Sequence, residues 1–306
     1  MFVYISHPDC KKHDNGQDHP ESYSRLSKIE DQLITQRLFD FMLLETAQAA
    51  TNEDILRVHT PRLWQSLQAL SPDSGYAKLD DDTTLSPDSL TAAKLSAGAV
   101  IQGVDELMNQ RASGVFCNVR PPGHHAEIDK AMGFCLLNNA AIGAAYAFEK
   151  YGIERIAILD FDVHHGNGTE TYAEQEQRLC FISSYEEDIY PFPQAGSAYE
   201  NILKLPLKRG TRGDEFLQTW EEKAWPMLRA QRPELIIVSA GFDAHRHDLM
   251  AGLDLMDTDF ALWAQSLQTL AAEIGHPKIL SVLEGGYELQ ALAKSVSAYI
   301  KVMADF

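Results

Sequence analysis

Cysteine pairs, signal-like segments and long apolar runs are all missing from this sequence of 306 residues. None of its four cysteines belongs to a C-x-x-C pair, which excludes a zinc ribbon and a thioredoxin-like redox motif. Residues 1–6 form too short and too uncharged a segment for a signal peptide. No apolar run approaches the length of a membrane span. We therefore expect a cytoplasmic protein without a membrane partner.

Basic residues are also scarce: 26 lysines and arginines stand against 44 aspartates and glutamates, so the net charge is -18 at pH 7. Such an acidic surface disfavours contact with nucleic acid phosphates, and we expect no nucleic acid partner. It would suit a cationic substrate, although acidic surfaces most often serve solubility. The hydrophobic fraction of 45% is enough to bury a sizeable core. Composition leaves the oligomeric state open.

Strand patterns alternate with helix patterns along the chain, and residues 71–84 are expected to form a loop. Alternation of this kind predicts an α/β fold with a central parallel sheet and helices on both faces. No segment has the composition of a linker, so residues 1–306 are predicted to form a single domain. Four apolar strands, each followed by a polar or glycine-rich loop, are predicted at 114–119, 155–160, 235–239 and 278–283.

The strand at 155–160 runs directly into the sequence Asp-Phe-Asp-Val-His-His. Unpaired carboxylates are rarely buried, so this pattern indicates a site at the carboxyl end of the strand, where open α/β sheets bind ligands. Asp162 and His164 are two residues apart, project to the same side and are able to bind one ion together. Asp243 follows another apolar strand and is the best candidate for a third ligand. A catalytic zinc site uses such ligands and keeps one position open.

Tandem histidines, His124 and His125, follow Arg-Pro-Pro-Gly in the loop after the strand at 114–119. Histidine titrates near neutral pH, so the pair is suited to work as base and acid. For an isolated pair, ordinary loop hydrogen bonds would be the preferred interpretation. Each histidine needs an orienting partner, and Asp160 and Asn167, which flank the metal pair, are available.

The segment Glu284-Gly-Gly-Tyr287 follows the last predicted strand. Two glycines allow the backbone to turn tightly and place a phenol over the sheet edge. A tyrosine hydroxyl is able to donate to a carbonyl oxygen that gains negative charge. Alone, this segment would be read as a turn with a surface aromatic. Together with the other motifs, it predicts an oxyanion donor.

In this combination and order, the motifs resemble the zinc-dependent histone deacetylase family, which includes bacterial histone deacetylase-like amidohydrolases and acetylpolyamine amidohydrolases. The residues Glu284 and Asn167 resemble those of the class II branch, whereas class I members carry glycine and aspartate at these two positions. The resemblance implies the arginase/deacetylase fold as one catalytic domain. It extends over nearly the whole chain, in segments 19–21, 58–60, 120–126, 133–139, 160–168, 239–243 and 284–287.

The resemblance also implies the metal ligands. Zinc would be bound by Asp162, His164 and Asp243. A monovalent cation, K⁺, would lie near Asp160, Asp162, His164 and Ser183, held largely by backbone carbonyls.

The implied reaction is zinc-dependent hydrolysis of an N-acyl amide, chiefly N-acetyl, on a lysine-like or other primary amine. His124 would pair with Asp160. His125, near Asn167, would serve first as general base and then as general acid. Tyr287 matches the tyrosine that stabilises the transition state in this family. The expected substrate is therefore an acyl-lysine peptide or a small acylated amine.

Four further residues match the family's acyl-lysine tunnel. Phe134, next to Gly133, and Phe192 match its aromatic walls, with core packing as the alternative. Met250 stands where polyamine-specific relatives carry a glutamate, and its apolar side chain argues against a dedicated polyamine enzyme.

Two other functions remain open from the sequence. An arginase-like ureohydrolase with two manganese ions would share the fold, but it would need an aspartate at the position of Gly166. A catalytically silent module that binds acyl-lysine is the second alternative. All the expected catalytic residues are present, which favours an enzyme.

Overall fold

The computed structural model describes residues 1–194 and 196–306. Within these residues, the core is an eight-stranded parallel sheet of order β2-β1-β5-β10-β9-β6-β7-β8. A strand whose two faces are both covered by helices is apolar along its whole length, and the four predicted strands have such sequences. The strands are β1 (Phe2–Ser6), β2 (Met42–Thr46), β5 (Gly114–Cys117), β6 (Ile156–Asp160), β7 (Leu179–Glu186), β8 (Ile202–Leu207), β9 (Leu235–Ala240) and β10 (Lys278–Leu283).

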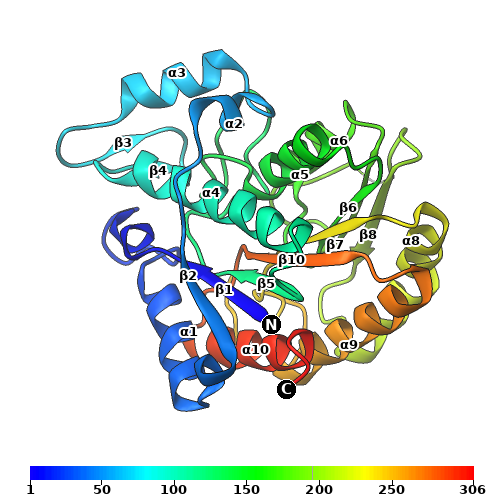
Figure 1. The fold of residues 1–306 in the computed structure, drawn as a ribbon. Helices are drawn as coiled ribbons and strands as arrows, with labels where there is room; N and C mark the ends of the chain where they lie inside the picture. Colours follow the sequence, from blue (N-terminus) through cyan, green and yellow to red (C-terminus); the bar gives the residue numbers. More distant parts are fainter. Residues whose placement is uncertain (195) are drawn as a thin grey trace.

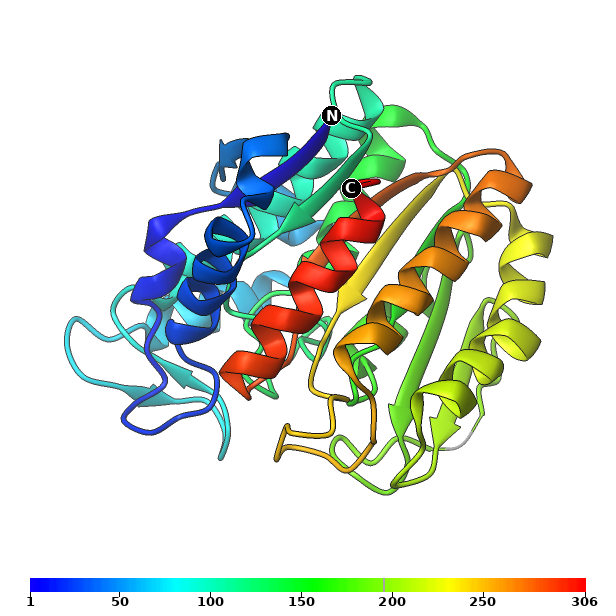
Figure 2. The ribbon, with the colours of Figure 1, turned by 90° about the horizontal axis from the view of Figure 1, so that it is seen from below.

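Helices cover both faces of the sheet (Figures 1 and 2). Helices α4 (Ser89–Met108) and α5 (Asn139–Tyr151) lie on one face; α1 (Ser24–Thr35), α9 (Asp257–Ile274) and α10 (Leu289–Met303) lie on the other. This arrangement confirms the predicted fold class. Shorter elements are η1 (Pro8–Lys12), η2 (Leu38–Phe41), α2 (Asn52–Leu56), α3 (Pro61–Leu70), α6 (Asn167–Ala173), α7 (Gly213–Thr219), the π-helical turn η3 (Trp220–Ala224) and α8 (Trp225–Gln231). No helix in the described part of the chain is long and apolar enough to cross a membrane.

The sequence pattern does not reveal the two edge strands, β2 and β8. Most side chains of β2 are exposed or half-buried, and β8 contains Pro206, which has no N–H to donate to a neighbouring strand. The segment 71–84, predicted to be a loop, contains the short strand β3 (Ala77–Lys78) and the first residue of β4 (Thr84–Leu85). These two strands pair as an antiparallel hairpin. The periodicity of apolar residues therefore finds the buried centre of the sheet better than its edges.

Parallel pairing brings the ends of the central strands to one edge of the sheet (Figure 2). In register, Asp160 at the end of β6 lies opposite Ser183 of β7 and Ser239 of β9. The next residue, Phe161, points the other way and packs against Trp263, with ring centroids 4.7 Å apart. Alternation along an extended chain thus puts the aspartates on the site side and anchors this segment through an aromatic core.

Candidate metal centre and catalytic site

Asp162, His164 and Asp243 converge at this edge of the sheet. All three are buried, and one ligand atom from each lies within 4.8 Å of the others. Nδ1 of His164 is 3.1 Å from Oδ1 of Asp162 and 3.2 Å from Oδ2 of Asp243. Oδ2 of Asp243 is buried and accepts no well-aligned hydrogen bond, because the single hydrogen that Nδ1 of His164 is able to carry is shared with Oδ1 of Asp162. A buried carboxylate oxygen without a donor is costly, so this arrangement fits a bound cation.

Backbone groups orient the two carboxylates. The N–H of Val163 donates to Oδ1 of Asp243 at 2.9 Å, and the N–H of Gly285 donates to Oδ2 of Asp162 at 2.8 Å. A Cβ atom at Gly241 or Gly285 would collide with the Asp162 carboxylate. These glycines therefore permit the close backbone approach that holds the ligands in place.

The charges of the three ligands depend on one another. Burial raises the pKa of Asp243 to about 6, and the nearby Asp162 charge adds to this. Burial alone would lower the pKa of His164, but the carboxylates of Asp162 and Asp243, which face its ring, outweigh burial and raise the pKa to about 10. A proton on His164 thus partly neutralises the carboxylates. Metal ligands must be deprotonated, so a divalent cation would replace this proton.

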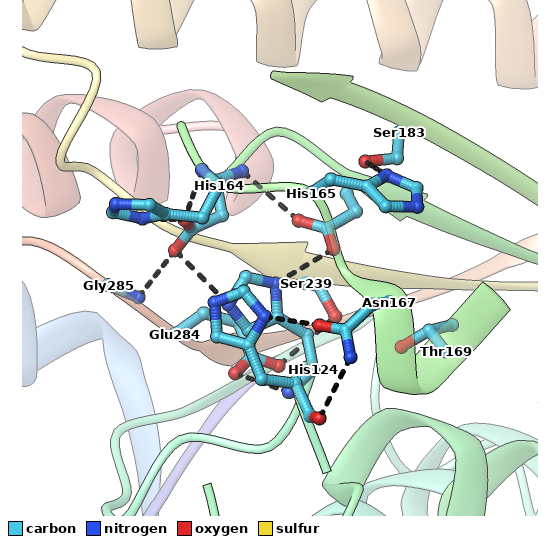
Figure 3. A network of polar contacts seen from close by, with 12 residues as sticks. His124, His164, His165, Asn167, Thr169, Ser183, Ser239, Glu284 and Gly285 are labelled. Carbon is cyan, nitrogen blue, oxygen red and sulfur yellow. Dashed lines mark hydrogen bonds and ion pairs between the residues drawn. The ribbon is translucent and has the colours of Figure 1, made fainter. Parts of the chain in front are cut away.

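The two tandem histidines have different partners. Nδ1 of His124 lies 3.0 Å from Oδ2 of Asp160, whereas Nδ1 of His125 lies 2.7 Å from Oδ1 of Asn167. Figure 3 shows this network around the strand ends. The amide nitrogen of Asn167 donates to Glu127 at 2.7 Å, so its oxygen is the atom that faces His125. Nδ1 of His125 therefore carries the hydrogen, which leaves Nε2 as the proton acceptor.

Electrostatics separate the two histidines further. Burial would lower the pKa of His124, but the charges of Asp160 and Asp162 outweigh it and raise the pKa to about 10. Burial lowers the pKa of His125 well below its usual value, and the neighbouring His124 charge lowers it further. The structure thus places a cationic His124 beside a neutral His125. A neutral, buried imidazole is suited to accept a proton.

Glu284 connects three strand ends and is a site residue that the sequence analysis did not assign. Its Oε2 accepts the N–H groups of Gly123 at 2.7 Å and of His124 at 3.2 Å, and its Oε1 accepts the hydroxyl of Ser239 at 3.1 Å (Figure 3). The side chain is fully buried, and burial raises the pKa of Glu284 to about 7. The sequence signal was its position at the end of a core strand, where an apolar residue would otherwise be expected.

The predicted oxyanion donor, Tyr287, follows Glu284 after two glycines. Burial raises the pKa of Tyr287 well above its usual value, so its phenol stays protonated and able to donate. The guanidinium of Arg25 lies 5.0 Å from the ring centroid and donates to the carbonyl oxygen of Gly286 at 2.6 Å. Arg25 therefore fixes both the ring and the turn that carries it.

A cavity of about 130 Å³ opens over these groups. The walls include three of the predicted pocket residues, Gly133, Phe134 and Met250. Asp82, from the loop before β4, was not predicted; its only sequence signal is the acidic run that contains it. The described residues that line the cavity are Asp82, His125, Gly133, Phe134, His164, Tyr190, Met250 and Tyr287.

The predicted wall position of Phe192 is wrong. Its side chain is 71% exposed, and Tyr190 occupies the wall instead, with its ring 5.1 Å from that of His125. The N–H of Phe192 donates to the carbonyl of Ile189 at 2.8 Å. This tight turn reverses the chain just after Tyr190 and directs Phe192 to solvent, which aromatic spacing alone does not reveal.

Comparison with known proteins supports the geometry. The model of the histone deacetylase domain matches residues 19–303. The chain belongs to the histone deacetylase family. It is 38% identical over 307 residues to an uncharacterised protein of Synechocystis sp., covering 98% of this chain and 99% of that one. It is 34% identical over 278 residues to a histone deacetylase-like amidohydrolase of Pseudomonas aeruginosa, covering 88% and 72% of the two chains.

Among solved structures, the crystal structure of the HDA15 HD domain superposes with a TM-score of 0.93 at 31% identity. The match covers 100% of this chain and 90% of that one. The predicted arginase/deacetylase fold is thereby confirmed. Membership of the histone deacetylase family supports a deacetylase or amidohydrolase activity for the chain.

Proposed function

We propose that this chain hydrolyses an N-acyl amide, chiefly N-acetyl, on a lysine-like or other primary amine, in a zinc-dependent reaction that releases a carboxylate and a free amine. One observation carries the proposal. His164, which belongs to the buried group Asp162, His164 and Asp243, lines the same cavity as His125 and Tyr287.

The ligand set fits zinc. Two carboxylates and one imidazole nitrogen are ligands that zinc accepts, and three protein ligands leave a position open for water or substrate. Oδ2 of Asp243, which accepts no well-aligned hydrogen bond, is the carboxylate oxygen that a metal ion would bind. When bound, zinc acts as a Lewis acid that polarises an amide carbonyl and makes water more acidic.

The side chains supply the proton transfers. Nε2 of His125 accepts the proton of the attacking water while Asn167 holds Nδ1. As the carbonyl carbon becomes tetrahedral, the hydroxyl of Tyr287 donates to the developing oxyanion. His125 then delivers its proton to the amine nitrogen, and the C–N bond breaks. His124 remains cationic beside Asp160 and keeps the pKa of His125 low, which favours this final proton release.

The cavity shape sets the substrate class. Phe134, Tyr190 and Met250 form apolar walls that suit the methylene chain of an acylated lysine or a similar amine. Asp82 is the acidic group at this cavity and is able to accept an N–H of the substrate. We therefore propose an acyl-lysine peptide or a small acylated amine as the partner.

We also propose a K⁺ ion near Asp160, Asp162, His164 and Ser183. Within the described chain, no donor is bonded to the main-chain carbonyl oxygens of Asp162 and His164, so both are free to bind a cation. Ser183 lies opposite Asp160 in the sheet, and its Oγ is 3.0 Å from Nδ1 of His165. In this interpretation His165 orients Ser183 and has no catalytic role.

The two alternatives fit less well. A second group of potential ligands, His124, Cys135 and Glu284, also lies within 4.8 Å. Burial raises the pKa of the Cys135 thiol well above its usual value, whereas a metal ligand must be deprotonated, and Gly166 stands where an arginase-like site needs an aspartate. Both features disfavour a second metal ion and an arginase-like reaction. A catalytically silent binding module would not need a neutral base and a phenol on the same cavity.

A substrate panel tests the proposal. Zinc-loaded protein should release acetate from capped N-acetyl-lysine, acetyl-lysine peptides or acetylpolyamines. A chelated sample serves as the matched control and should be inactive. Zinc-loaded protein that binds these compounds without releasing acetate from any of them would favour the silent module.

A further inference from the structure

A surface groove of about 570 Å³ continues outward from the catalytic cavity. The groove and the cavity share Met250 and Tyr287. Its apolar lining also includes Pro20, Leu249 and Leu289, which come from three separate segments of the chain. The loop that carries Leu249 projects from the same edge of the sheet as the catalytic loops (Figure 2). Met250 is 37% exposed, so the groove meets the cavity where the cavity opens to solvent.

The two carboxylates of the groove are already engaged. Oδ2 of Asp248 accepts the N–H groups of Tyr287 at 2.6 Å and Glu288 at 3.0 Å, and its Oδ1 accepts that of Met250 at 3.1 Å. Glu288 caps α10 by accepting the N–H of Ala291 at 2.6 Å. These hydrogen bonds hold both carboxylates against the backbone of the groove. The groove also offers apolar contact.

Leu249 is the most exposed large apolar residue of the described chain, at 96%. Its neighbour Asp248 is only 5% exposed and is tied to the Tyr287 turn. The leucine is thus held at the cavity mouth by a hydrogen-bonded turn. A solvent-exposed apolar side chain beside a binding cavity favours contact with a partner.

The direction of the reaction decides which part of a substrate meets this groove. The acyl group enters toward His125 and His164, so the rest of the amine must leave through the mouth beside Met250 and Tyr287. A polypeptide has side chains next to its acyl-lysine that are able to reach the groove. A free acylpolyamine has no apolar side chain to place there.

We propose that this groove is a subsite for an apolar residue adjacent to acyl-lysine, which makes a polypeptide, not a free polyamine, the preferred substrate. This inference rests on the proposed function. Contact with Leu249, Met250 and Leu289 stabilises the bound peptide and raises kcat/KM for sequences with leucine beside the acetyl-lysine.

Four substrates and two variants test the subsite with zinc-loaded protein. The substrates are a capped single acetyl-lysine, two acetyl-lysine tripeptides flanked by leucine or by serine, and N-acetylspermidine. The leucine peptide should show a kcat/KM roughly tenfold above the serine peptide, in keeping with the discrimination of an apolar pocket. Leu249→Ser should bring this ratio to about 1. Leu70→Ser, at a 47% exposed position on α3, is the matched control and should keep the ratio.

Equal kcat/KM values for the two peptides, or a ratio that survives Leu249→Ser, would overturn the subsite while the capped acetyl-lysine is still hydrolysed. A higher kcat/KM for N-acetylspermidine than for every peptide would overturn the preference for polypeptides. No turnover of any substrate, the capped lysine included, would overturn the proposed function and the subsite with it.

Discussion

Nδ1 of His125 lies 2.7 Å from the side-chain oxygen of Asn167, so the proposed base of this site is oriented by a neutral amide. A carboxylate at this position would add a charge that favours the protonated imidazole. The amide supplies the orientation without that charge. Burial and the neighbouring His124 therefore keep the pKa of His125 below its usual value.

The first prediction concerns this partner. In Asn167→Asp, an anion beside His125 raises the pKa of its imidazole. A general base works in its unprotonated form, so the acidic limb of the kcat/KM profile should move to higher pH. The measurement is the pH dependence of kcat/KM for both proteins on one acetyl-lysine peptide. A limb that stays in place or moves to lower pH would show that His125 is not the base.

The second prediction concerns Tyr287. Tyr287→Phe keeps the ring that Arg25 contacts but removes the donor to the oxyanion. Loss of one such donor costs roughly 10²–10³ in kcat. Zinc content, measured by elemental analysis, should be unchanged, because Tyr287 is not a ligand. A variant with wild-type kcat would rule out the oxyanion role.

The third prediction concerns Glu284, which holds the backbone of Gly123 and His124. In Glu284→Gln, the amide oxygen still accepts these N–H groups, so kcat should remain close to that of the wild type. Glu284→Ala leaves the buried N–H groups without an acceptor, which costs about 1–3 kcal/mol, and frees the loop that carries the histidines. We expect a fall in kcat with little change in KM. Equal kcat values for the two variants would contradict a positioning role.

The fourth prediction is a pH dependence of stability caused by a buried histidine outside the ligand set. His59 is buried; its Nδ1 lies 2.9 Å from the carbonyl oxygen of Glu127, and its Nε2 accepts the N–H of Asn138 at 2.8 Å. Burial lowers the pKa of His59 to about 4. Between this value and the ordinary value near 6.5, the unfolded chain binds more protons than the folded one, so the free energy of unfolding rises with pH through this window.

This contribution, roughly 3 kcal/mol for such a shift, is complete above about pH 6.5 and lost as the pH falls to about 4. Denaturant unfolding at several pH values should show a shallower dependence for His59→Gln than for the wild type. The other buried histidines are present in both proteins and do not affect the difference. If the free energy of unfolding had the same pH dependence in both proteins, His59 would not be the source of this contribution.

The sequence predicted the parts of the site that local spacing controls. The two-residue interval between Asp162 and His164 on an extended segment puts both side chains on one face, and the structure brings them together with Asp243. Tyr190 and Phe192 show where prediction from local spacing fails. Both are aromatic and two residues apart, and the turn that selects one of them depends on a main-chain hydrogen bond that composition does not encode.

Two other features depend on tertiary contacts. From the sequence, Glu284 is part of a glycine-rich turn. Its role appears only when the loop after β5 and Ser239 of β9 are placed beside it. Asp82 reads as part of a solvated acidic run, and only the folding of the β3–β4 segment against the cavity brings it to the site. The edge strands β2 and β8 are not predicted because their exposed and half-buried side chains weaken the apolar pattern.

Titration of metal-free protein with zinc, with acetate release from an acetyl-lysine peptide as the readout, tests the central claim most directly. Activity should rise with added zinc and reach its plateau at one zinc per chain. Asp243→Ala, which lacks the carboxylate oxygen that accepts no well-aligned hydrogen bond in the wild type, should bind zinc far more weakly and gain no comparable activity. A plateau at two metal ions per chain, activation by manganese alone, or full activity of the chelated protein would contradict a single-zinc deacylase.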